Sequence, residues 1–269
     1  MSVAVVFDSA GTLLHTYRVA KDLIQDSIMV DIETTTLAYA CEGRALVTLY
    51  VHSRDIIDAA PETLLSSYIT EHHTPFGIAC SCQVVTGDQV KAALADDRRA
   101  HIGDLQDCIR MVWKSCRKEA VVAMASGVMI NLVLGGIEFV ITSGGRPFPG
   151  ARSTIRRLQE MGVATYIASG DRTDKLVRIA DYLGIPHDNV HGVATPAIKA
   201  QVVDDLRTQY DTVVMVGDGI NDLNAMYTAD LAILSEQQSG KKPSPLYDAA
   251  DHVITKVTEV VDIVASLKK

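Results

Sequence analysis

The apolar positions of the chain follow two different patterns. At the N-terminus, and again after about residue 127, short apolar runs alternate with amphipathic helical stretches. The run Val163–Ala168 comes directly before a helical pattern over Thr173–Leu183, and Thr212–Val216 is a second such run. A short run that is apolar at every position is typical of a strand buried on both faces of a parallel sheet. The repeated strand–helix units therefore predict an α/β core, with a Rossmann-like parallel sheet and helices on both faces.

The segment 17–126 lacks this regular repeat. Its pattern predicts a mixture of strands and helices, with strands at Ser27–Ile32, Ala45–Val51 and Ile78–Val84 and helices at Ser53–Ile69, Asp88–Ala95 and Asp104–Val122. Because this segment separates the first core strand from all the others, it is predicted to form an inserted α+β cap domain. The predicted division is thus a core of residues 1–16 and 127–269 and a cap of residues 17–126.

One long apolar stretch, Ala120–Ile137, approaches the length of a membrane span. Polar side chains and the pair Gly135-Gly136 interrupt it, and Glu138 ends it. Two apolar runs on either side of a glycine turn are typical of a β-hairpin. We therefore expect a buried hairpin of the core, formed by Val128–Val133 and Ile137–Thr142, and no membrane segment.

Charge and composition narrow the choice of partners. The chain has 25 Lys and Arg against 33 Asp and Glu, which gives a net charge of −8. An acidic surface of this kind does not attract nucleic acid or an anionic membrane. The five cysteines are odd in number and irregularly spaced, and the N-terminus has no basic region, so neither a disulfide framework nor a signal peptide is expected. A cytoplasmic protein acting on a small molecule is the prediction.

The first candidate for chemistry is Asp8, which follows the strand-like run Val3–Phe7. A carboxylate at the carboxyl end of a parallel strand lies at the edge where open α/β sheets bind their ligands. The turn behind it, which runs from Ser9 to Gly11 and Thr12, offers backbone N–H groups to an anion. Taken alone, an Asp-Ser pair after a strand is also an ordinary turn.

Two further candidates follow later strands. Ser169 and Gly170 come directly after the strand Val163–Ala168, where a hydroxyl and backbone N–H groups can hold a phosphoryl oxygen or simply cap a helix. Lys199 lies one turn into a helix that begins at Pro196. A lysine there is either a solvated helix residue or, beside an anionic site, the cation that neutralises a transferred phosphoryl group.

The most specific signal is the pair Asp218 and Asp222, at the junction between the strand Thr212–Val216 and the next helix. Two carboxylates close together among glycines provide the oxygen ligands that hard cations require. Mg²⁺ fits best, because it keeps several waters and bridges to a phosphate. A structural turn explains one capping acid but not the pair.

These motifs together resemble those of the haloacid dehalogenase superfamily. The resemblance is narrower still to the phosphorylation domain of P-type ATPases without membrane segments, as in soluble archaeal P-type ATPase-like phosphatases. It covers the first 14 residues and about Val128 to Val264. The sequences that carry it are Asp8-x-x-Gly11-Thr12, "GGRPFPGARSTIRRLQEMGVATYIASGDR", "ATPAIKAQVVDDL" and "MVGDGINDLNAM".

The resemblance implies a role for each candidate. Asp8 would be the nucleophile that forms an aspartyl-phosphate, with Ser169 and Lys199 holding the phosphoryl oxygens. Asp218 and Asp222, together with Asp8 and the carbonyl of Ala10, would hold Mg²⁺, and Asn221 would orient neighbouring groups. The implied activity is that of a Mg²⁺-dependent phosphatase or ATPase acting on a small phosphate substrate. A nucleotide is one candidate substrate, and the sequence does not predict the oligomeric state.

The chain departs from the superfamily at Ala10. Most of its phosphatases carry a second aspartate there, which protonates the leaving group and then activates water. Alanine does neither, so we expect slow hydrolysis or a preference for good leaving groups, unless a histidine such as His15, His72 or His73 replaces the acid. Two alternatives stay open: a phosphonoacetaldehyde-type C–P hydrolase, which needs a Schiff-base lysine from the cap, and a non-enzymatic module that responds to phosphate or nucleotide.

Overall fold

The structure is a computed structural model that describes residues 1–269 except 82, 116–122, 239–241 and 269. The chain forms two compact units, which are considered one at a time. The first consists of Met1–Thr16 and Gly145–Lys269, and the second of Tyr17–Gly144.

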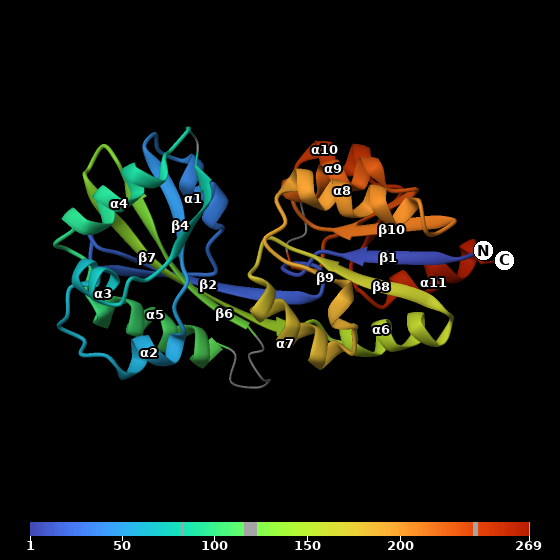
Figure 1. The fold of residues 1–269 in the computed structure, drawn as a ribbon, viewed down its shortest axis with the longest axis horizontal. Helices are drawn as coiled ribbons and strands as arrows, with labels where there is room; N and C mark the ends of the chain where they lie inside the picture. The colour runs from blue at the N-terminus through green and yellow to red at the C-terminus, as the bar shows by residue number, and fades with distance from the viewer. Residues whose placement is uncertain (82, 116–122, 239–241, 269) are drawn as a thin grey trace. The chain divides into compact units, whose positions relative to one another are not determined.

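The first unit is built on a six-stranded parallel sheet (Figure 1). Its central strand β1 (Val3–Phe7) is buried at every position, as expected of a strand covered on both faces. The order across the sheet is β12 (His252–Ile254), β11 (Leu231–Ser235), β10 (Thr212–Gly217), β1, β8 (Val163–Ala168) and β9 (Val190–His191).

Helices cover both faces of this sheet (Figure 1). One face carries α8 (Pro196–Arg207), α9 (Leu223–Thr228) and α10 (Ser244–Ala249), whose apolar side chains form one core cluster with the strands. The other face carries α6 (Ala151–Glu160), α7 (Thr173–Leu183) and α11 (Glu259–Leu267). Two 3₁₀ turns, η1 (His187–Asn189) and η2 (Ile220–Asp222), complete the unit. The predicted fold class, a Rossmann-like parallel sheet with helices on both faces, is confirmed.

Local signals in the sequence set the limits of these helices. Thr195 is the N-cap of α8, where its side chain accepts a hydrogen bond from the N–H of Ile198, and Pro196 occupies the first turn. Helix α7 ends at Gly184, which has the left-handed conformation common after a helix. Helix α7 has the predicted bounds, and α8 begins at the predicted residue.

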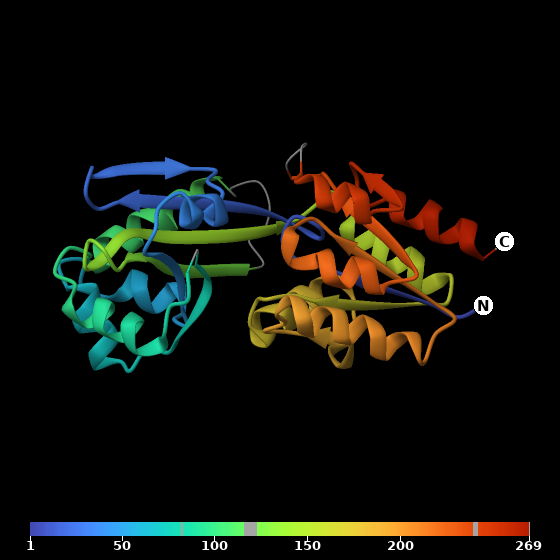
Figure 2. The ribbon, with the colours of Figure 1, turned by 90° about the horizontal axis from the view of Figure 1, so that it is seen from above.

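The second unit contains a six-stranded sheet with antiparallel pairing between β2 and β3 and between β4 and both β5 and β6. The order is β3 (Ser27–Val30), β2 (Leu14–Asp22), β7 (Gly136–Pro147), β6 (Ala123–Asn131), β4 (Arg44–Leu49) and β5 (Phe76–Ser81). Figure 2 shows a layer of helices against one face of this sheet. That layer consists of α2 (Ser53–Asp58), α3 (Leu65–Glu71), α4 (Gly87–Asp96) and α5 (Ile102–Ser115).

A smaller apolar cluster covers the opposite face of the second sheet. It includes Ala38 of the short helix α1 (Thr34–Tyr39), together with Met129, Phe139 and Ile141 from the sheet. The second unit therefore has its own hydrophobic core, as expected of an inserted domain. Within the described residues, none of the helices has the length and apolar character needed to cross a bilayer.

One predicted boundary is wrong. The first division falls between Thr16 and Tyr17 as expected, but the second falls at Gly145, so residues 127–144 belong to the second unit and not to the parallel core. The predicted hairpin is present as β6 and β7, and β6 pairs with β4. An apolar strand pattern shows that a strand is buried, but it does not show which sheet the strand joins.

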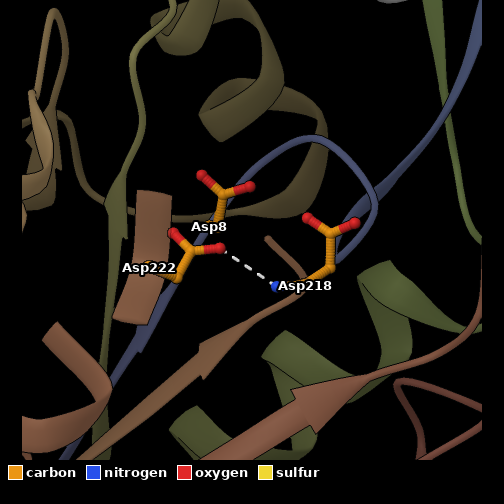
Figure 3. A group of neighbouring side chains, drawn as sticks. All are labelled: Asp8, Asp218 and Asp222. Carbon is orange, nitrogen blue, oxygen red and sulfur yellow. Dashed lines mark hydrogen bonds between the residues drawn. The ribbon is translucent and has the colours of Figure 1, made fainter. Parts of the chain in front are cut away.

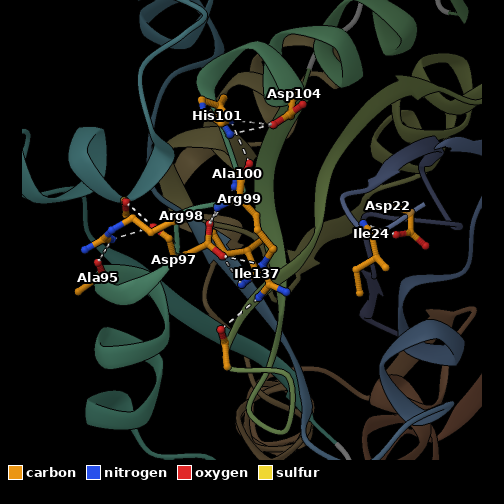
Figure 4. Close-up of polar contacts among 12 residues, drawn as sticks. Asp22, Ile24, Ala95, Asp97, Arg98, Arg99, Ala100, His101, Asp104 and Ile137 are labelled. Atoms are coloured by element: carbon orange, nitrogen blue, oxygen red, sulfur yellow. Dashed lines mark hydrogen bonds and ion pairs between the residues drawn. The ribbon is translucent and has the colours of Figure 1, made fainter. Parts of the chain in front are cut away.

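Polar contacts explain why this hairpin belongs to the second sheet. Asp97 is buried, and its carboxylate accepts hydrogen bonds from the backbone N–H groups of Arg99, Ala100 and, across the sequence, Ile137 at 3.0 Å (Figure 4). In the same hairpin, Glu138 forms an ion pair with Arg44 at 2.5 Å. Both contacts tie β7 to segments of the cap.

Two further expectations about the cap need correction. The predicted helix Ser53–Ile69 is two helices, α2 and α3, with Pro61 between them, because proline lacks the N–H that a continuous helix requires. The helix expected over Asp104–Val122 is described as Ile102–Ser115, and residues 116–122 lie outside the described part of the chain. The strand β2 and the helix α1 were not expected from the sequence.

Candidate active site

The carboxyl ends of β1, β8 and β10 bring the candidate residues to one edge of the parallel sheet. In register, Phe7 of β1 pairs with Ile167 of β8 and with Val216 of β10. The residues that follow these strands, Asp8, Ser169 and Asp218, therefore emerge at the same edge. This is where the carboxyl ends of parallel strands place a ligand site.

Three carboxylates form a compact cluster there. Asp8, Asp218 and Asp222 each present an oxygen, and these three oxygens lie within 4.8 Å of one another. Figure 3 shows the three side chains, with a hydrogen bond from the backbone N–H of Asp218 to the Asp222 carboxylate at 3.0 Å. The N–H of Gly219 donates to the same oxygen at 3.1 Å. Asp222 is thus oriented by the loop that carries Asp218.

Lys199 joins two members of this cluster. Its Nζ lies 2.5 Å from Asp8 Oδ1 and 2.6 Å from Asp222 Oδ1, and both the lysine and Asp222 are fully buried. A buried ammonium group is tolerated only when it is paired and hydrogen-bonded. Lys199 is therefore buried against the carboxylate cluster and is not the solvated helix residue that its position in α8 would also allow.

Burial and charge shift the ionisation of this pair. Burial raises the pKa of Asp8 to about 8, Asp222 and Asp218 act in the same direction, and Lys199 acts against them. For Lys199, burial by itself lowers the pKa, but Asp8 and Asp222 outweigh it and raise that pKa above its usual value. The lysine is thus held as a cation, and further positive charge beside Asp8 would lower the pKa of Asp8.

The loop after Asp8 is held by close packing and by hydrogen bonds. Gly11 has a φ of +78°, and a Cβ at this position would lie 2.1 Å from Asp218 Oδ2. Ser235 Oγ donates to the Gly11 carbonyl at 2.9 Å, and the Gln237 side-chain amide donates to the Thr12 carbonyl at 2.9 Å. Only glycine gives Asp218 this position beside the loop.

Two hydroxyl groups of the loop are buried without a protein partner. Ser9 Oγ and Thr12 Oγ1 have no hydrogen-bond partner among the described residues, and both side chains are fully buried. Buried hydroxyls are normally hydrogen-bonded, so such groups need an explanation. A ligand that binds to the loop would provide one.

The other predicted residues differ in their exposure. Ser169 is buried, and its backbone is hydrogen-bonded on both sides to the segment His191–Ala194, while Gly170 is exposed. Ala10 is half-buried. Asn221 is exposed, and its amide oxygen lies against Gly219. The structure therefore brings Asp8, Lys199, Asp218 and Asp222 into direct contact or close proximity.

Three residues near the site were missed from the sequence: Ser235, Gln237 and Lys242. Lys242 Nζ lies 2.8 Å from Asp218 Oδ2. Ser235 ends β11, so the rule that selected Ser169, a hydroxyl directly after a parallel strand, would also have selected it. Gln237 and Lys242 follow in a connecting segment and stand in no motif.

A hard divalent cation fits this donor set. Three carboxylates supply oxygen ligands only, as Mg²⁺ prefers, and three close anions need a positive counterion. Glycine at position 217 leaves space for Asp222, because a Cβ there would approach its side chain to 2.6 Å. The chemistry and the space of the site are both consistent with Mg²⁺ held by Asp8, Asp218 and Asp222.

Comparison with known proteins identifies the family. A model of the haloacid dehalogenase-like hydrolases matches residues 3–230, which include every candidate site residue predicted from the sequence. The chain therefore belongs to the haloacid dehalogenase-like hydrolases. It is 31% identical over 264 residues to the soluble P-type ATPase-like phosphatase of Methanocaldococcus jannaschii, a match that covers 98% of this chain and 93% of that protein.

Other relatives match the chain over a smaller part of their length. The chloroplastic copper-transporting ATPase PAA2 of Arabidopsis thaliana is 31% identical over 112 residues, which is 42% of this chain and 13% of that protein. Among solved structures, the catalytic domain of the CPx-ATPase CopB-B superposes with a TM-score of 0.50 at 15% identity, covering 97% of this chain and 88% of that one. That likeness concerns the fold alone.

Proposed function

We propose that this hydrolase is a Mg²⁺-dependent phosphohydrolase that acts through an aspartyl-phosphate on Asp8. The observation that carries the proposal is the buried contact of Lys199 with both Asp8 and Asp222, beside Asp218. The resemblance to the soluble P-type ATPase-like phosphatase, which extends through the cap, supports the same assignment.

The residues present account for the first half of such a reaction. The carboxylate of Asp8 attacks the phosphorus, a new O–P bond forms, and the bond to the leaving group breaks, with its electron pair passing to the leaving group. Lys199 neutralises charge on the phosphoryl oxygens, and Ser169, Gly170 and the loop hydroxyls bind them. Mg²⁺, held by Asp8, Asp218, Asp222 and the Ala10 carbonyl, would offset the repulsion between two anions and favour the carboxylate form of Asp8.

The second half of the reaction lacks the acid–base residue that related phosphatases have at position 10. Water must attack the phosphorus and release phosphate, which regenerates the Asp8 carboxylate. Position 10, where related phosphatases have an acid that serves both steps, is an alanine. We therefore propose that the substrates carry good leaving groups, such as nucleoside polyphosphates or aryl phosphates, and that release of phosphate from Asp8 is slow.

The raised pKa of Lys21, a lysine of the cap, disfavours the C–P hydrolase alternative. A Schiff-base amine needs a lowered pKa so that it is uncharged when it attacks a carbonyl. The hydrogen bond from Lys21 to Asp104, at 2.7 Å, instead raises the pKa of Lys21, although burial acts in the opposite direction. Lys91 and Lys114 are exposed, and Lys118 lies outside the described residues.

A phosphate-release screen tests the proposal. The full chain is assayed with Mg²⁺ against nucleotides, sugar phosphates and aryl phosphates, beside Asp8→Asn as the matched variant. We expect release from at least one class of good-leaving-group substrate, dependence on Mg²⁺, and loss of release in Asp8→Asn. Full turnover by Asp8→Asn would disprove the assignment of the nucleophile.

The cytoplasmic location stays a prediction from the sequence.

A further inference from the structure

Lys242 places a second ammonium group at the carboxylate cluster. Its Nζ contacts Asp218 Oδ2 at 2.8 Å, and the side chains are only 9% and 20% exposed, respectively. Asp8 and Asp222 share the ammonium of Lys199. Each of the three carboxylates therefore contacts a lysine, and Lys242 is a lysine that contacts Asp218.

The position of Lys242 is fixed by a helix that carries no motif residue. The backbone N–H of Lys242 donates to the Tyr247 hydroxyl at 3.1 Å, and that hydroxyl donates to Glu236. Tyr247 belongs to α10, which is anchored by the fully buried Leu246. The backbone of Lys242 is thus tied to the first unit, and its side chain extends to Asp218.

This contact sets up a competition. An ammonium ion and a divalent cation bound to the same carboxylate repel each other, since both are positive and only a few ångströms apart. A cation that takes Asp218 Oδ2 as a ligand therefore competes with Lys242 for that oxygen. We propose that Lys242 is a built-in counterion of the metal site, which holds Asp218 in the absence of the divalent cation and lowers the affinity for it.

This inference rests on the proposed Mg²⁺ site, and it gives Lys242 a positioning role that acts through Asp218. Where a ligand binds only the fraction of molecules in which its site is free, the apparent dissociation constant rises by the inverse of that fraction. For a partly buried pair of this kind, removal of the ammonium is expected to tighten Mg²⁺ binding by about fivefold or more. A lysine that merely supported the fold would not tighten binding when removed.

The test is calorimetric titration of the full chain with Mg²⁺, without substrate. We expect Lys242→Met to lower the dissociation constant for Mg²⁺ by about fivefold. Lys242→Arg keeps the cation and should have a dissociation constant near the wild-type value. Lys175→Met should leave the dissociation constant unchanged. Lys175 is the matched control, because it forms a 2.8 Å pair with Asp171 outside the carboxylate cluster. Lys242→Gln repeats the measurement if Lys242→Met does not fold.

Thermal unfolding provides a second readout. Lys242→Met is expected to have a lower Tm than the wild type without metal, and a larger rise in Tm when Mg²⁺ is added. The role of Lys242 would be overturned if Lys242→Met and Lys242→Gln bound Mg²⁺ no more tightly than the wild type. If in the same experiment the wild type bound Mg²⁺ and Asp218→Ala did not, the proposed metal site itself would stand. Failure of the folded wild type to bind Mg²⁺ would overturn both the metal site and this inference.

Discussion

At the scale of single residues, the site depends on how closely the Asp8 loop approaches Asp218. Gly11 allows this close approach because it has no Cβ and adopts a positive φ, a combination that no other residue reproduces without strain. The buried contacts of Lys199 then fix Asp8 and Asp222 on the other side. The geometry of the cluster is therefore set by one glycine and one lysine as much as by its acids.

Replacement of Gly11 tests this dependence. The Cβ of Gly11→Ala would displace Asp218, and displacement of a catalytic group by about 1 Å is expected to lower phosphate release about 100-fold or more. Phosphate release and Mg²⁺ affinity are measured together, with circular dichroism to check the fold. Gly87→Ala is the control, since no atom lies within 4 Å of a Cβ there, and it should retain wild-type values. Normal activity in Gly11→Ala would argue against the observed packing.

Ala10 offers a test by gain of function. If the missing acid limits the reaction, Ala10→Asp should raise the steady-state rate at least about tenfold, because a placed general acid–base contributes 10²–10⁴-fold in enzymes. Ala10→Asn has the same shape without the proton exchange, and it should stay near the wild-type rate. The comparison is made on one aryl phosphate with saturating Mg²⁺. Equal rates for the two variants would show that another group, such as His15, already serves this role.

The residues that could be predicted share a simple rule. Asp8, Ser169 and Asp218 follow buried strands, and the carboxyl ends of parallel strands meet at one edge, so their proximity follows from the strand pattern. Lys242 could not be found in this way. Its contact depends on the path of a connecting segment and on the docking of α10, and neither leaves a periodic signal in the sequence.

At the scale of elements, the hairpin β6–β7 shows what an apolar pattern leaves open. The sequence predicts both strands but assigns them to the parallel core, whereas they belong to the second sheet. The apolar pattern does not distinguish the two, because side chains such as Val128 and Ile130 would be buried equally well in either unit. The decision is made by polar partners far away in sequence. Asp97 and Arg44 in the cap bind the backbone of Ile137 and the carboxylate of Glu138.

The Glu138 contact predicts a pH-dependent stability. Burial by itself raises the pKa of Glu138, but hydrogen bonds from Arg44 and Asn131 outweigh it and lower that pKa below its ordinary value of 4.5. A lowered pKa means that the stabilisation is complete above about pH 4.5 and is lost as the pH falls through the lower, folded-state value. Glu138→Gln, which resembles the protonated acid, should therefore cost about 3 kcal/mol at pH 7, and this cost should fall as the pH falls through the lowered pKa of Glu138.

Urea unfolding of the two proteins at several pH values measures this difference. Glu160→Gln serves as the control, because Glu160 forms an exposed pair with Arg156 and its replacement should change the unfolding free energy by less than about 1 kcal/mol at every pH. A cost of Glu138→Gln that does not depend on pH would mean that the ion pair is not the source of the stabilisation.

At the scale of the whole molecule, each unit has a hydrophobic core of its own. The cap cluster is drawn from Val19 to Val140, and the cluster under α8, α9 and α10 contains only residues of the parallel unit. All the residues of the proposed site belong to the parallel unit. Among the described residues, the cluster that would perform the chemistry comes from the parallel unit, and the contribution of the cap is expected to concern the substrate.

Independent cores predict independent folding. A fragment of residues 14–147, which keeps β2 and β7 whole, should unfold in urea in a single cooperative transition, since domains with their own core fold as units. Circular dichroism and intrinsic fluorescence should report the same midpoint. A fragment without a cooperative transition would show that the cap depends on the parallel unit for its stability.

The central claim is that Asp8 is phosphorylated during turnover, and trapping the phosphoenzyme tests it most directly. The full chain is quenched in acid during turnover of a substrate found in the screen, and the adduct is located by mass spectrometry. The account predicts a Mg²⁺-dependent, acid-stable and hydroxylamine-labile phosphate on Asp8 that accumulates because Ala10 slows its release, and none on Asp8→Asn. A wild-type chain that releases phosphate at full rate, with the label absent from Asp8 or carried by another residue, would contradict it.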